Sequence, residues 1–267
     1  MYATLFSSLY IPFILFLVFI IFRAVSIEFR SKEKMLWWRK SWDISYSLSS
    51  IMLAFLLGVV LGNVLEGIAV GENYEYQGKG FFEFFTPFTL LTGFSVLFLL
   101  MTHGAIYLLL KTEGKLYDRL TVLVKQGIIA FIVVFAITTL YTLIYIPHLS
   151  DKFQNNPEFF VVPLAAFLSI ANIPRLISKK KFMPAFLFSS LTICLLLIIV
   201  AIEVYPTMLF STIDPKYNID IYNAASSTKS LKIMLTMVAI GGPLVLSYTI
   251  FVYRTFKGKV KLDEHSY

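Results

Sequence analysis

Seven long stretches of the 267-residue chain contain no charged side chain, and they limit the folds open to it. A helix needs about 20 apolar residues to cross the hydrocarbon core of a bilayer. The stretches are residues 1–22, 44–65, 84–110, 126–150, 159–174, 182–202 and 233–253. Six are long enough, and the fifth is marginal because it holds 16 residues and ends at Pro174. We therefore predict an all-α polytopic membrane protein whose seven transmembrane helices form a single domain over residues 1–267.

The composition argues against several other classes of protein. Hydrophobic residues make up 58% of the chain and charged residues only 15%, whereas a soluble domain carries about 25% charged residues. A soluble enzyme, a disordered tail and a nucleic-acid-binding module are therefore poor interpretations. The single cysteine, Cys194, excludes an internal disulfide and a cysteine-rich zinc or iron–sulfur site.

The basic residues are distributed unevenly among the connections between the apolar stretches. Alternate connections, beginning with residues 23–43, hold 18 of the 23 lysines and arginines, and the remaining connections hold five. Cytoplasmic loops of membrane proteins collect Lys and Arg, so the pattern predicts an outside N-terminus and a cytoplasmic C-terminus. The net charge of +7 then follows from topology, with the lipid bilayer as a partner and no need for nucleic acid.

The histidines are the first candidates for a cofactor site. His103 lies toward the inner end of the third stretch, His148 at the outer end of the fourth, and His265 in the tail. Because an axial pair should lie at one depth in the membrane, we expect no haem and no metal on this chain alone. P-loop, GxSxG and HExxH motifs are absent from the sequence, which argues against a self-contained hydrolase or an ATP-driven pump.

Two charged residues stand directly at the predicted cytoplasmic boundary. Arg23 ends the first stretch and Asp43 precedes the second, so antiparallel helices could bring them together. One interpretation is a place where protons enter; the alternative is a snorkelling arginine and a first-turn carboxylate that the helix dipole favours. The residues alone favour the alternative. We expect Glu66, Glu83 and Glu203, at external helix ends, to be solvated.

Several segments that combine a membrane helix with a polar end follow one another along the whole chain. They are FRAVSIEFRSK (22–32), WWRKSWD (37–43), LGNVLEG (61–67), TPFTLLTGFSVLFLLMTHGAIYLLLKTEG (86–114), FLFSSLTI (186–193), YNAASSTKSLKIML (222–235) and GGPLVLSYTIFVYRTFKGKV (241–260). No segment is specific by itself, but their order and spacing together resemble subunit II of the cytochrome bd-type quinol oxidases.

The resemblance implies a function that the composition cannot supply. Subunit II of this family pairs with a larger subunit I that holds haem b and haem d, and it binds no haem itself. The complex oxidises quinol and reduces oxygen to water in an aerobic respiratory chain of a bacterial or archaeal inner membrane, in some cases with small accessory subunits. We thus expect an oxidase subunit without catalytic residues of its own. The resemblance also assigns Arg23 and Asp43 to the proton pathway of subunit II.

The chain departs from the family pattern at its start. The family has about two further helices before the position of Met1, and a Trp-Asp-Gly-Asn motif there is implicated in proton transfer and quinone binding. This leaves three expectations: the helices come from another chain, translation starts earlier, or the chain is a truncated fragment that does not assemble. A secondary transporter is the main functional rival, but the stretches carry almost no central charge.

Overall fold

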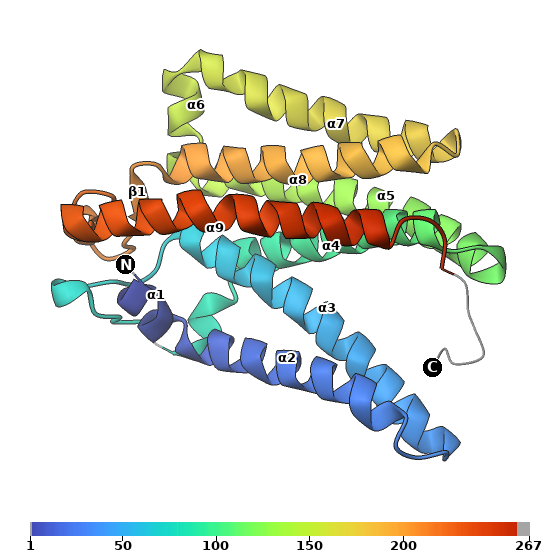
Figure 1. Ribbon diagram of the computed structural model, residues 1–267. Helices are drawn as coiled ribbons and strands as arrows, with labels where there is room; N and C mark the ends of the chain where they lie inside the picture. Colours follow the sequence, from blue (N-terminus) through green and yellow to red (C-terminus); the bar gives the residue numbers. More distant parts are fainter. Residues whose placement is uncertain (1, 79, 261–267) are drawn as a thin grey trace.

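The computed structural model describes residues 2–78 and 80–260, so Met1, Lys79 and the tail with His265 lie outside the described residues. The described chain contains seven helices that are long and apolar enough to cross a membrane (Figure 1). They are α2 (Tyr10–Arg30), α3 (Leu36–Glu66), α4 (Pro87–Lys111), α5 (Gly114–Tyr145), α7 (Val161–Ser178), α8 (Phe182–Val204) and α9 (Thr228–Thr255). The prediction of an all-α protein with seven transmembrane helices is confirmed.

The first apolar stretch forms two helices instead of one. A short helix α1 (Tyr2–Ser8) is followed by Leu9, which is not helical, and α2 starts at Tyr10. Pro12 explains the interruption, because its ring would clash with the carbonyl of Ser8 in a continuous helix. The membrane-spanning helix therefore begins later than the apolar stretch and continues to Arg30.

Each of the other helices extends past at least one end of its uncharged stretch, because lysine, arginine and glutamate are good helix formers wherever a helix leaves the bilayer. Helix α3 includes the WWRKSWD segment, and α5 includes the 12 residues from Gly114 up to residue 126. Helix α7 passes through Pro174 and ends at Ser178, four residues later than predicted. The proline removes only one backbone hydrogen bond near the helix end.

Helix α4 lies at the centre of the packing and contacts α3, α5 and α8. Thr86 begins it by accepting a hydrogen bond from Thr89 N (3.1 Å), and Pro87 occupies the first helical position. Helices α4, α5, α7 and α8 enclose the largest apolar core, which contains Ile106 and Phe131. Figure 1 shows α7 and α8 running side by side along this bundle.

Helices α3 and α4 cross at very short range. A Cβ atom added to Gly58 would lie 2.7 Å from Gly93 Cα, and one added to Gly62 would lie 2.9 Å from Thr89 Cα. Small residues allow such an approach in membrane helices. The crossing couples the α2–α3 pair to the four-helix bundle.

The two ends of the molecule differ. At the basic end lie the turns joining α2 to α3, α4 to α5 and α7 to α8, together with the end of α9 (Figure 1). At the capped end, β1 (Thr207–Leu209) and β2 (Ile219–Asp220) pair antiparallel. The remaining short helices at this end are η1 (Glu72–Tyr74), η2 (Phe81–Phe84), η3 (Pro147–Leu149), α6 (Asp151–Asn155), η4 (Pro157–Phe160) and η5 (Pro215–Tyr217).

The cap connects loops that are far apart in the sequence. Ile68 N donates to Phe210 O (2.9 Å), and Ser211 Oγ donates to Val70 O (2.6 Å). Leu9, Ile68 and Leu209 share a small apolar core beneath these bonds. The loop after α3 is therefore fixed by the loop after α8.

Lys152 completes the end of α8. Its Nζ donates hydrogen bonds to the carbonyl oxygens of Ile202 (2.9 Å) and Glu203 (2.7 Å), which have no intrahelical partner at a helix end. Burial lowers the pKa of Lys152, and the nearby carboxylate of Glu203 opposes this shift.

We expect Lys152→Met to lower the free energy of unfolding by about 1–3 kcal/mol, because it removes two charge-assisted hydrogen bonds and keeps the apolar stem. Denaturation of the purified protein would measure the loss. Lys216→Met is the control, since Lys216 is an exposed lysine whose ion pair with Asp214 spans 3.5 Å. Equal losses in both variants would contradict a capping role.

Candidate functional site

The candidate site lies at the basic end, where α2 and α3 form an antiparallel pair. A turn over residues 31–35 joins them. Trp38 fixes the geometry because its Nε1 donates to Phe29 O (2.8 Å), while the Trp42 ring packs 5.4 Å from the Phe29 ring. These aromatic side chains lie at the helix ends, as in an interfacial belt.

Asp43 pairs with Arg30, a residue that the sequence argument does not single out. Arg30 Nε donates to Asp43 Oδ1 over 2.6 Å, and about half of each side chain is exposed (48% and 54%). An exposed pair of this kind contributes little to stability, because water screens the charges. The carboxylate is therefore held in place but remains accessible from the end of the bundle.

Arg23 lies deeper and contacts an aromatic ring instead of Asp43. Its guanidinium carbon is 5.5 Å from the centre of the Tyr46 ring, a cation–π distance. Arg23 precedes Arg30 by seven residues, which places it about 10 Å further along the helix axis. Between the two arginines, Ser26 Oγ and Ser45 Oγ lie 3.1 Å apart.

These residues form a polar seam between α2 and α3. Arg30 and Asp43 lie at the helix ends, and Arg23 and Tyr46 lie further along the helices. Arg23, Ser26 and Arg30 follow the i, i+3, i+7 spacing of one helix face, and this spacing is the signal that could have found Ser26 and Arg30. Ser26 is buried, whereas both arginines are exposed on the isolated chain. We name Arg23, Ser26, Arg30, Asp43 and Tyr46 the boundary seam.

The three glutamates at the capped end interact with neighbouring side chains, whereas the sequence predicts that they are solvated. Glu66 Oε2 accepts a hydrogen bond from Thr86 Oγ1 (2.5 Å), and Glu83 Oε2 accepts one from Tyr76 Oη (3.2 Å). Burial and the neighbouring Glu83 carboxylate raise the pKa of Tyr76 to about 12. Glu203 is only partly exposed, beside Lys152. Only Glu83 is exposed as expected.

The two described histidines contact different elements. His103 Nδ1 lies 2.7 Å from Ser189 Oγ in α8, and its ring stacks on Phe186 at 4.8 Å. His148 Nε2 lies 3.2 Å from Leu65 O at the end of α3. Within residues 2–78 and 80–260, no group of three or more His, Cys, Asp or Glu side chains could hold a metal ion.

Comparison with known proteins identifies the family of this chain. The family model described as cytochrome bd terminal oxidase subunit II matches residues 1–256. The chain belongs to this family. It is therefore a subunit of a membrane-bound oxidoreductase complex, and the secondary-transporter alternative finds no support.

Relatives of known name agree with the family match. Cytochrome bd-I ubiquinol oxidase subunit 2 of Escherichia coli K12 is 26% identical, over 98% of this chain and 77% of that protein. Cytochrome bd ubiquinol oxidase subunit 2 of Bacillus subtilis 168 is 27% identical, with the same coverage. The solved bd oxidase of Geobacillus thermodenitrificans shares the fold, with a TM-score of 0.70 at 19% identity over 94% of this chain and 74% of that chain.

Proposed function

We propose that this chain supports a haem-bearing subunit I in a cytochrome bd-type quinol oxidase. The family match over residues 1–256 carries the proposal. The contacts of His103 and His148 suit helix packing better than haem ligation, which supports our assignment of haem b and haem d to the partner subunit. Quinol is the substrate of the complex, in the cytoplasmic membrane of a bacterium or archaeon, with or without small accessory subunits.

The boundary seam supports a part in proton delivery. Asp43 is a carboxylate exposed at the basic end, and the Ser26–Ser45 contact and Arg23 continue the polar groups toward the membrane interior. A charged side chain inside a bilayer costs about 2.5–3.5 kcal/mol at a helix centre. Arg23 lies about one to two helical turns further into the membrane than Arg30, so its guanidinium needs polar surroundings. A hydrated path along the seam, or a facing subunit, provides these surroundings.

The orientation of the helices supports the same role. The described connections at the basic end hold most of the lysines and arginines, and this distribution supports a cytoplasmic location for the basic end and an outside location for the capped end. Protons consumed in the reduction of oxygen would then reach Asp43 from the cytoplasm. The single membrane domain of residues 1–267 would hold the seam against subunit I.

The proposal is tested by a reduced-minus-oxidised absorption spectrum of the complex purified from native membranes by a C-terminal tag on this chain. We expect bands of haem b and haem d and a larger co-purified polypeptide, because the chain assembles with subunit I. A haem-free preparation without a partner would contradict the proposal and favour a fragment that does not assemble.

A further inference from the structure

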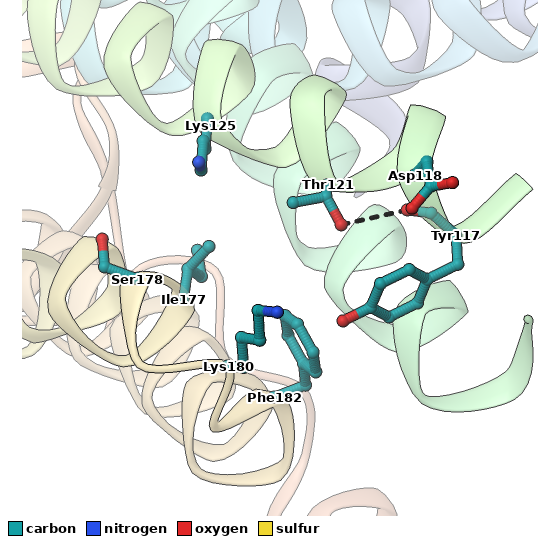
Figure 2. A pocket seen from close by; sticks show the side chains of 8 residues that line it. All are labelled: Tyr117, Asp118, Thr121, Lys125, Ile177, Ser178, Lys180 and Phe182. Atoms are coloured by element: carbon teal, nitrogen blue, oxygen red, sulfur yellow. Dashed lines mark hydrogen bonds between the residues drawn. The ribbon is translucent and has the colours of Figure 1, made fainter. Parts of the chain in front are cut away.

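A pocket of about 220 Å³ opens at the basic end, between the first turns of α5 and the turn that joins α7 to α8. Figure 2 shows Lys125 extending from α5 toward the end of α7, with Lys180 and Tyr117 on the other sides of the space. The pocket is remote from the boundary seam, which lies on α2 and α3. It shares no residue with the boundary seam or with the cap.

The charges around the pocket favour an anion. Lys125 and Lys180 are both exposed, and none of the ion pairs found among the described residues engages either lysine. Asp118 also borders the pocket, and in Figure 2 it lies beside Thr121 and Tyr117, across the space from Lys125. Lys179 and Lys181 flank Lys180 and add to the positive potential.

The backbone of Lys180 adopts a conformation that glycine would suit better. Its φ is 55°, in the left-handed region, and Lys180 N donates to Ile177 O (2.9 Å) in the turn that ends α7. Glycine is the usual residue at such a helix end because a side chain is strained there. A lysine keeps a cation at the edge of the pocket despite this strain.

The inner wall of the pocket is apolar. Ile177 is 4% exposed, and the rings of Tyr117 and Phe182 meet edge to face at 5.7 Å. Beyond Lys125 along α5, Ile129 and Val133 are exposed on the surface of the helix (62% and 51%), within the apolar stretch of residues 126–150. A ligand that fits has an anionic head and apolar chains beside it.

We propose that this pocket binds the headgroup of an anionic phospholipid. The phosphate lies between Lys125 and Lys180 within reach of the Tyr117 hydroxyl, and the acyl chains run along the exposed apolar side of α5. Basic pockets between membrane helices bind such headgroups in this way. A free phosphate ion would use the two lysines but not the apolar surface, which favours the lipid.

Native mass spectrometry of the full chain in its complex, titrated with phosphatidylglycerol and with phosphatidylcholine, tests the proposal. We expect preference for phosphatidylglycerol, and a loss of affinity of about 5-fold in Lys125→Gln and about 25-fold in the Lys125→Gln, Lys180→Gln double variant. Lys180→Gly separates binding from folding, because it should weaken binding about 5-fold while the midpoint of thermal unfolding stays equal or rises.

The control removes two lysines from the same end of the molecule but from the α2–α3 turn, as Lys32→Gln with Lys34→Gln. We expect this variant to bind phosphatidylglycerol as the unaltered chain does. An equal loss in the control would overturn the proposal, because it would show attraction to the whole basic end. Full displacement of the lipid by millimolar inorganic phosphate would also overturn it, in favour of a phosphate site.

Discussion

Replacing Gly58 by alanine is expected to lower the free energy of unfolding by about 1–3 kcal/mol. The added Cβ would lie 2.7 Å from both Gly93 Cα and Thr92 O, which are backbone atoms that cannot rotate away. Helices α3 and α4 must therefore move apart and lose packing along their crossing. This loss exceeds the gain of about 1 kcal/mol that alanine brings to a helix interior. Denaturation of the purified complex measures the change.

The matched control is Gly104→Ala in α4, where no atom lies within 4 Å of the added Cβ. We expect the stability of this variant to be unchanged or to rise by up to about 1 kcal/mol. If both variants lost the same stability, close packing at Gly58 would not be the reason.

Asp43→Asn is expected to slow oxygen reduction by about 10-fold or more while the haem content of the complex stays constant. The amide keeps the size of the side chain and can still accept a hydrogen bond from Arg30, but it cannot take up and release a proton at physiological pH. Oxygen consumption with excess quinol, normalised to haem, measures the effect. Asp43→Glu should restore most of the rate, and Arg23→Ala should also slow turnover.

Arg30→Gln distinguishes proton transfer from a structural role. This variant breaks the same ion pair and leaves the carboxylate of Asp43 in place. We expect a much smaller reduction in rate than in Asp43→Asn. Equal slowing in both variants, or a loss of haem in either, would show that the ion pair holds the structure; unchanged turnover in Asp43→Asn would remove the residue from the proton pathway.

The fold class could be predicted because crossing a membrane requires long uncharged stretches, and these are read directly from the sequence. The helix bounds were less predictable. Residues such as Arg39 and Asp118 continue a helix into the headgroup region, while Pro12 interrupts one inside an apolar stretch. The first charged residue marks where the bilayer ends along the sequence, but the helix can continue past that point.

The site was predictable only in part, because pairing depends on helix rotation as well as on depth. Arg23 and Asp43 were found from their position at the ends of apolar stretches, but the sequence did not show that Asp43 faces Arg30 and that Arg23 faces Tyr46. The pocket beside Lys125 and Lys180 depends on α5 lying against the α7–α8 turn, where Tyr117 contacts Phe182, a residue 65 positions later, and no local pattern indicates such a contact.

The cap, at the end opposite the boundary seam, constrains the order in which parts of the chain can fold during synthesis. Ser211 Oγ binds Val70 O across 141 residues of sequence, so the loop after α3 lacks its partner until α8 and the segment after it have been synthesised. At ribosomal speeds of about 5–20 residues per second, this delay is roughly 7–30 s. During biogenesis, α2 and α3 therefore rely on the crossing at Gly58 and Gly62 well before the cap closes over their ends.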